Sequence, residues 1–108
     1  MAQVCEVDLC SLPDQERRLV ARNLHSFIEQ RLDVLGRQLA EAEARANSFA
    51  VKYGQDLNTF AERRLPETQD SEEYGDYVHW FMSQREVDEY RRLLQEYRDL
   101  ARQLAILG

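Results

Sequence analysis

The chain has 108 residues, a length that accommodates one domain, and its formal net charge is -6. Its hydrophobic content of 44% is typical of a globular protein, and no apolar run approaches the roughly 20 residues that a membrane span requires. The acidic balance disfavours nucleic acid as a general partner, and the first residues lack a signal-peptide pattern. We therefore expect a cytoplasmic protein without a membrane segment.

Residues 4–10 alternate apolar and acidic side chains, which is the pattern of a short strand. Val7 and Leu9 lie on the same side of this strand, and the sequence offers no second strand to pair with it. We expect these two side chains to contact a partner, with the strand added to the edge of the partner's sheet. Cys5 and Cys10 would lie on opposite faces about 16 Å apart, which predicts two reduced thiols and neither a disulfide nor a zinc site.

A hydrophobic stripe predicts a long helix over residues 12–53, because its members recur at alternating steps of three and four. Ser11 and Pro13 mark the start of this helix, and Gly54 follows its end. About 40 residues at 1.5 Å each make a rod of roughly 60 Å, which requires an equally long partner helix. The stripe consists of Leu32, Leu35, Leu39, Ala42, Ala46, Phe49 and Tyr53.

Two further helices are predicted after this rod. Asp56 is suited to cap a short helix over residues 56–65. An acidic connector then leads into a second long helix over residues 71–107, with Asp70 and Glu73 spaced as a capping box. The residues expected to face inward from this helix are Tyr77, Trp80, Phe81, Val87, Tyr90, Leu94, Tyr97, Ala101 and Leu104.

These elements predict an all-α fold in which two long helices form an antiparallel hairpin joined by a short helix. Ion pairs four residues apart, such as Asp14 with Arg18 and Glu41 with Arg45, are expected on the outer faces. We predict one domain, which comprises a strand-like or flexible arm (1–11), the first long helix (12–53), the short helix (56–65) and the second long helix (71–107).

Apolar residues outside the predicted helix contact indicate a partner. A two-helix hairpin leaves its flanks exposed, and its core falls short of the entropy cost of ordering the chain. Leu24 and Phe27 lie on such a flank and join Val7 and Leu9 as candidate interface residues. We expect either a homodimer that forms a four-helix bundle or docking on another protein.

No constellation of residues predicts catalysis. The sequence has no glycine-rich phosphate loop and no nucleophile with a plausible base. Asp76 and His79 have the spacing of one half of a di-metal motif, but the chain lacks the second half. His25 falls on an extension of the hydrophobic stripe, where we expect a partly buried, hydrogen-bonded side chain. We therefore expect no enzyme activity, no cofactor and no bound metal.

A spaced set of residues in the second half of the chain matches a known pattern. It comprises Tyr53 and Gly54 at a helix end, Phe60 in a short helix, and then Asp76 and Trp80 after an acidic connector. With these residues, the chain resembles the small helical antitoxin-like proteins of prokaryotic toxin-antitoxin operons. The resemblance implies that the five residues are a folding signature. It also implies a protein that binds a small, possibly basic toxin and holds it inactive.

Two other interpretations are set against this one. The chain is alternatively a structural coiled-coil adaptor or assembly subunit without a toxin partner. The strand, proline and helix over residues 7–16 are similar to the opening of ribbon-helix-helix antitoxins. However, Glu6 and Asp8 stand where basic or amide side chains would read DNA, so we do not expect direct operator binding.

Overall fold

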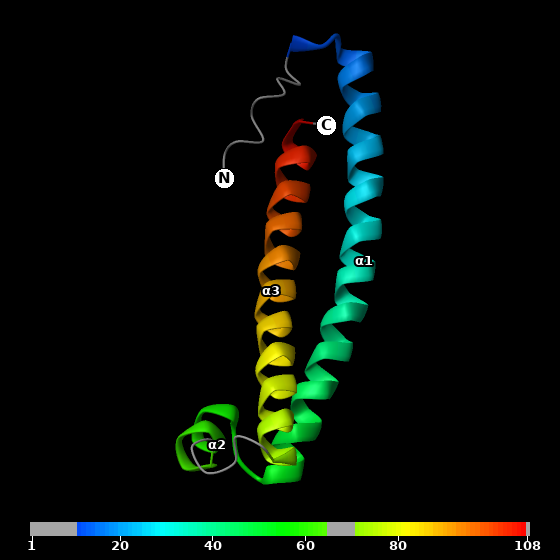
Figure 1. Ribbon diagram of the computed structural model, residues 1–108. Helices are drawn as coiled ribbons and strands as arrows, with labels where there is room; N and C mark the ends of the chain where they lie inside the picture. The colour runs from blue at the N-terminus through cyan, green and yellow to red at the C-terminus, as the bar shows by residue number, and fades with distance from the viewer. Residues whose placement is uncertain (1–10, 65–70, 108) are drawn as a thin grey trace. The chain divides into compact units, whose positions relative to one another are not determined.

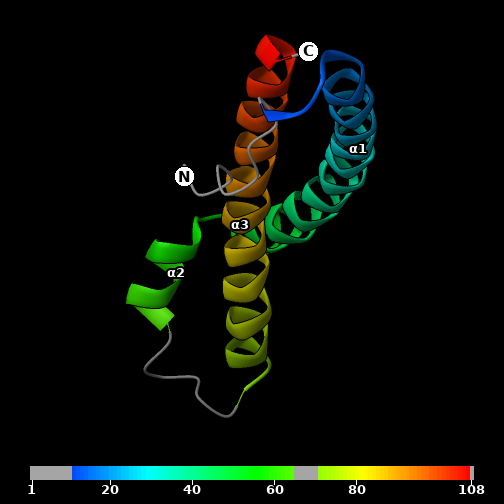
Figure 2. The ribbon, with the colours of Figure 1, turned by 90° about the horizontal axis from the view of Figure 1, so that it is seen from above.

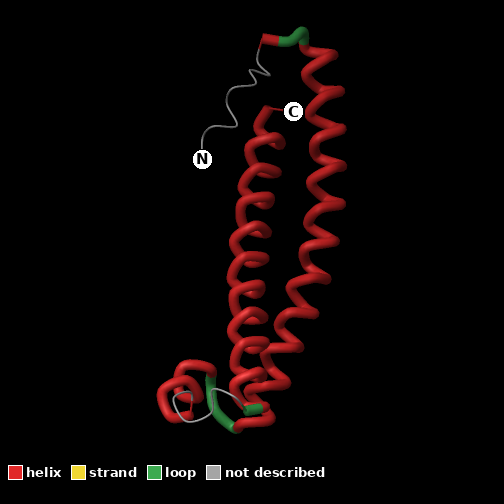
Figure 3. Tube along the Cα trace, viewed as in Figure 1, coloured by secondary structure: helices red, strands yellow, loops and turns green. Residues whose placement is uncertain are grey.

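The computed structural model describes residues 11–64 and 71–107. This part of the chain is helical apart from short turns, and none of it forms a strand (Figure 3). The two long helices pack against each other, which confirms the predicted all-α fold. The strand predicted at residues 4–10 lies outside the described residues. The helices are α1 (Asp14–Tyr53), α2 (Leu57–Arg64) and α3 (Glu72–Leu107) (Figure 1).

Pro13 stands at the beginning of α1, and Gly54 stands at its end. The carbonyl of Pro13 accepts a hydrogen bond of 2.8 Å from the backbone N–H of Arg17, so Pro13 occupies the N-cap position. The helix predicted over residues 12–53 therefore begins slightly later than expected, because a residue that precedes proline is disfavoured in helical conformation. Gly54 ends the helix as predicted. Its φ is 63°, and its N–H donates to the carbonyl of Ala50 at 2.8 Å, which is a left-handed C-cap.

Side-chain caps begin the other two helices. Asp56 caps α2 as predicted, since its Oδ1 accepts a hydrogen bond of 2.8 Å from the backbone N–H of Thr59. This bond holds the pKa of Asp56 below its ordinary value. At α3, the Oγ of Ser71 accepts from the N–H of Tyr74 at 3.3 Å. Ser71 is thus the observed N-cap, whereas Asp70, for which a capping box was predicted, lies outside the described residues.

The chain divides into two compact units. The terminal unit comprises residues 1–34 and 94–108, and the central unit comprises Leu35–Leu93. In the terminal unit, the first half of α1 packs against the last part of α3 around the buried side chains of Ile28 and Leu104. The partly buried residues around this pair are Leu12, Val20, Leu32, Tyr97, Leu100 and Ala101.

The central unit contains α2 and the adjoining parts of both long helices. Figures 1 and 2 show α2 beside the first half of α3. Ala46, Phe60 and Trp80, one from each helix, form the buried centre of this unit. Here the end of α1 meets the beginning of α3, whereas in the terminal unit the beginning of α1 meets the end of α3. The two long helices are therefore antiparallel.

Phe81 is a correction to the predicted inward face of α3. Trp80 and Val87 are buried as expected, but Phe81 is 40% exposed. The contact face passes instead through Ser83, which is only 5% exposed and lies three residues after Trp80. Because successive helical residues point about 100° apart, a helix that turns Trp80 and Ser83 inward turns Phe81 outward. There the Phe81 ring packs on the Tyr77 ring at 6.0 Å between centroids.

Exposed ion pairs in the central unit join the middle of α1 to α3. Arg45 pairs with Glu86 at 2.6 Å, and Arg91 pairs with Glu43 at 2.8 Å. Arg45 was predicted to pair with Glu41 within α1, but its long side chain reaches across to α3 instead. Such exposed pairs contribute little free energy, typically below about 1 kcal/mol. They connect specific residues of α1 to specific residues of α3 in this unit.

Candidate functional site

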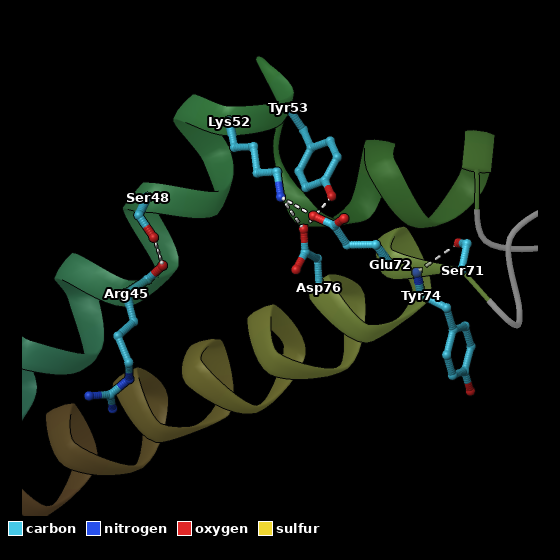
Figure 4. Close-up of polar contacts among 8 residues, drawn as sticks. All are labelled: Arg45, Ser48, Lys52, Tyr53, Ser71, Glu72, Tyr74 and Asp76. Carbon is cyan, nitrogen blue, oxygen red and sulfur yellow. Dashed lines mark hydrogen bonds and ion pairs between the residues drawn. The ribbon is translucent and has the colours of Figure 1, made fainter.

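The best-defined polar cluster is the Asp76 clasp, which comprises Lys52, Tyr53, Glu72 and Asp76 (Figure 4). The Tyr53 hydroxyl donates to Oδ2 of Asp76 at 2.5 Å. The Lys52 ammonium donates to the same oxygen at 2.7 Å and to Oε2 of Glu72 at 3.2 Å. The clasp therefore ties the last turn of α1 to the first turns of α3.

The clasp shifts the pKa of each group at its centre. Hydrogen bonds from Lys52, and then from Tyr53, hold the pKa of Asp76 below its ordinary value. Burial raises the pKa of Tyr53, and its hydrogen bond to Asp76 raises it further. The hydrogen bonds to Asp76 and Glu72 raise the pKa of Lys52. Near neutral pH the clasp thus consists of a carboxylate, a neutral phenol and an ammonium.

Aromatic packing lies directly behind the clasp. The Tyr53 ring is 4.4 Å from the Phe60 ring and 6.1 Å from the Trp80 ring, measured between centroids. Phe60 and Trp80 are in turn 5.6 Å apart, and Phe49 stacks on Trp80 at 6.0 Å. Pairs at these separations are typical of favourable aromatic contacts. The Tyr53 side chain therefore belongs to both the core and the clasp.

All five residues of the sequence pattern lie in this part of the central unit. Tyr53 and Asp76 form the hydrogen bond of the clasp, Phe60 and Trp80 form the core behind it, and Gly54 supplies the left-handed turn between α1 and α2. These are packing and capping roles. The clasp carboxylate of Asp76 already accepts two hydrogen bonds, so this arrangement holds helices together and offers no evident reactive group.

His79 does not combine with Asp76 into a metal site. The Asp76 carboxylate is directed at Lys52 and Tyr53, whereas His79 is exposed. Across the part of the chain that the structure describes, no three or more histidine, cysteine, aspartate or glutamate side chains are arranged to hold a metal ion.

A shallow pocket of about 350 Å³ lies in the central unit, beside the aromatic core. Its apolar lining includes Ala46, Trp80 and Val87, and the ion pair between Glu43 and Arg91 lies at its edge. Glu43 and Arg91 are thus paired with each other, and Asp56, which also lines the pocket, accepts the N-cap hydrogen bond of α2.

The terminal unit carries an apolar flank on α1, which consists of Val20, Leu24 and Phe27. Val20 is partly buried against the core of the unit, whereas Leu24 is 40% exposed and Phe27 is 51% exposed. At 100° per residue, all three lie on the same side of the buried Ile28. The structure thus places the predicted interface candidates Leu24 and Phe27 on a solvent-facing surface. Val7 and Leu9, the other two candidates, lie outside the described residues.

The opposite side of α1 carries a basic pocket of about 370 Å³. Arg18, Arg22 and His25 line it from α1, and Leu104 and Ala105 line it from α3. The prediction that His25 is partly buried is wrong, because its side chain is 49% exposed. Its Nδ1 lies 3.9 Å from Glu29, which is the outer limit for an ion pair when His25 is protonated.

Sequence reasoning missed the basic pocket. Arg18 was expected to pair with Asp14, but Asp14 pairs instead with Arg17 at 2.7 Å. The signal was present in the spacing of Arg18, Arg22 and His25 at steps of four and three, which places basic groups on one helical face.

In comparisons with known proteins, no family model, no curated protein and no solved structure matches this chain. Within residues 11–64 and 71–107, no helix combines the length and the apolar character needed to cross a membrane.

Proposed function

We propose that this protein is a protein-binding helical module that contacts its partner through the apolar flank of α1. The observation that carries this proposal is the exposure of Leu24 and Phe27, which lie one turn apart beside the partly buried Val20. Large apolar side chains gathered on one helical face are typical of an interaction surface. The clasp and the aromatic core hold the helices together, whereas Leu24 and Phe27 of this flank remain exposed to solvent.

The flank has the composition of an interface centre. Burying the exposed half of Leu24 or Phe27 would contribute roughly 1 kcal/mol for each side chain. Phe27 is the stronger anchor, because an aromatic ring adds contact area at a low cost in side-chain entropy. Both residues stand on a regular helix, so little backbone ordering accompanies binding.

A small basic protein is the partner that best fits the charge of the chain. The net charge of -6 attracts a basic partner and accelerates its encounter. The chain resembles antitoxin-like proteins, whose partner is a small toxin. The resemblance rests on the pattern of Tyr53, Gly54, Phe60, Asp76 and Trp80. In this proposal, the chain inactivates the toxin by direct binding.

A second candidate function is that of a structural subunit that assembles with copies of itself. Leu100 on α3 is partly buried against the same core as Val20, so each long helix places a partly exposed apolar side chain beside this core. A second copy would cover this surface symmetrically and form a four-helix bundle.

The experiment is a comparison of two variants of the full chain. Leu24→Asp combined with Phe27→Asp places charge on the flank, whereas Val51→Asp is the matched control at a 72% exposed position of the central unit. Tagged proteins are purified from the source organism, and their complexes are identified by mass spectrometry and sedimentation. A stoichiometric small basic protein, held by wild type and control and lost from the double variant, would support the toxin-binding function. A homodimer lost in the same way would support the structural subunit, and equal behaviour of all three proteins would refute both.

A further inference from the structure

The basic pocket of the terminal unit brings three basic side chains to one face of α1. Arg18, Arg22 and His25 line it from successive turns, and at 100° per residue they lie within an arc of about 60°. Among the residues that the structure describes, neither arginine has a carboxylate within ion-pair distance. Glu29 lies 3.9 Å from Nδ1 of His25 but does not line the pocket. Like charges four residues apart destabilise a helix slightly, so an anion that binds between the arginines relieves this repulsion.

The remaining wall of this pocket is apolar. Ala21 and Leu104 are buried, and Ala105 completes the wall from α3. An apolar cavity with a few convergent polar groups is typical of a small-molecule site. The volume of about 370 Å³ lies near the lower end of the usual range for such sites, roughly 300–1,000 Å³. An occupant of this pocket therefore combines an anionic group for the basic side chains with a small apolar body.

Two arginines beside a histidine favour a phosphate group as the anion. The guanidinium group binds phosphate through two parallel hydrogen bonds, and a phosphate monoester carries close to two negative charges at neutral pH. This charge matches Arg18 and Arg22 together, whereas a carboxylate would neutralise only one of them. Inorganic phosphate would leave the apolar wall facing water, and an ester places an organic group against it. We propose that the basic pocket binds a small organic phosphate monoester.

The spacing of the basic residues permits one phosphate to contact all of them. Arg18 and Arg22 are about 6 Å apart along the helix axis, and His25 follows about 4.5 Å further on. The two guanidinium groups donate to the phosphate oxygens, and the organic group lies against Leu104 and Ala105. This site lies on the opposite side of α1 from the apolar flank, so it goes beyond the proposed function and does not depend on it.

The two histidines of the chain provide the readout for a binding experiment. His25 lines the pocket, whereas His79 is an exposed residue of the central unit and serves as the internal control. Their ring proton resonances are followed by NMR in the full chain, at neutral pH and constant ionic strength, while phenyl phosphate is added. We expect the His25 resonances to shift to a plateau and the His79 resonances to stay unchanged. Inorganic phosphate should bind roughly tenfold more weakly, because it covers none of the apolar wall.

Variants test which side chains hold the ligand. Arg18→Gln combined with Arg22→Gln should lower the affinity by roughly tenfold or more, because it removes the charge-assisted hydrogen bonds to phosphate. Arg98→Gln removes an exposed arginine of α3 that does not line the pocket, so the affinity should be retained. Ala105→Glu places a carboxylate in the pocket and should abolish binding. Gln103→Glu adds the same charge at an exposed position of α3 outside the pocket and should not.

Three results would overturn the proposal. The first is no shift of the His25 resonances up to about 10 mM phenyl phosphate. The second is equal affinity for phenyl phosphate and inorganic phosphate, which would exclude an ester as the ligand. The third is equal affinity of the wild type and the double arginine variant, which would exclude the two arginines as its binding residues. Circular dichroism confirms that each variant compared is folded.

Discussion

The Tyr53 hydroxyl donates a hydrogen bond of 2.5 Å to the Asp76 carboxylate, across 23 positions of sequence. The same carboxylate accepts from Lys52, so one side chain of α3 holds two consecutive residues at the end of α1. Because the Tyr53 ring also packs on Phe60, this bond connects the surface clasp to the core of the central unit.

Removing the Tyr53 hydroxyl tests the strength of this bond. Tyr53→Phe keeps the ring and its stacking, so the expected loss in the free energy of unfolding is about 1 kcal/mol. Urea unfolding followed by circular dichroism measures it. Tyr74→Phe removes a hydroxyl from the same end of α3, and we expect a change within about 0.5 kcal/mol. Equal effects of the two substitutions would show that the bond contributes no specific stability.

The clasp also predicts how stability depends on pH. The pKa of Asp76 is lowered by folding, so its contribution is present above about pH 4 and is lost as pH falls through the lowered value. The pKa values of Tyr53 and Lys52 are raised, so their contributions are lost as pH rises above about 10.

The measurement is the difference in unfolding free energy between wild type and Asp76→Asn across this range. The difference should be largest between about pH 5 and pH 9, and should shrink towards both extremes. A difference independent of pH would mean that the charge of Asp76 has no part in stability.

Phe60 should be the residue on which the docking of α2 depends. It is fully buried in a cluster with Ala46 of α1 and Trp80 of α3, so Phe60→Ala is expected to cost about 3–5 kcal/mol and to speed amide hydrogen exchange in α2. Phe27→Ala makes the same deletion at an exposed position and should change the unfolding free energy of the isolated chain by less than about 1 kcal/mol. Unchanged exchange in α2 would contradict the assigned packing.

Gly36 of α1 and Gly54, which follows the end of that helix, should respond in opposite directions to replacement by alanine. Gly54 has a φ of 63°, so Gly54→Ala should destabilise the chain by about 1 kcal/mol. Gly36 lies inside the helix, and a Cβ added there would meet nothing within 4 Å. Gly36→Ala should therefore stabilise by up to about 1 kcal/mol. Thermal unfolding of the two variants measures both changes, and a stabilising Gly54→Ala would refute the left-handed cap.

The helices were predictable because their signals are local. The alternating steps from Leu32 to Tyr53 require a helix of that length, and Gly54 and Asp56 specify its end and the next beginning through hydrogen bonds within a few residues. Phe81 was misplaced because hydrophobicity alone favours it over Ser83 as an inward residue. Only the packing of Trp80 and Val87 fixes the rotation of α3 that turns Ser83 inward.

The contacts between distant residues were not predictable in the same way. Tyr53 and Asp76 were recognised as a pattern, but their hydrogen bond depends on how α1 and α3 meet. Arg18 and His25 had the spacing of a common face, but the pocket that they line is completed by Leu104 and Ala105 of the other long helix. A partner residue more than 70 positions away leaves no local signal in the sequence.

The burial of Trp80 has a practical consequence. It is the only tryptophan of the chain, and it lies among the side chains of all three helices within the central unit. Its fluorescence therefore reports on that unit alone, whereas circular dichroism reports on helices of both units. The native sequence thus carries a label-free test of whether the two units unfold together. If the transitions measured by fluorescence and by circular dichroism coincide, the two units unfold as one cooperative unit. If part of the helical signal is lost before the fluorescence changes, the terminal unit unfolds first.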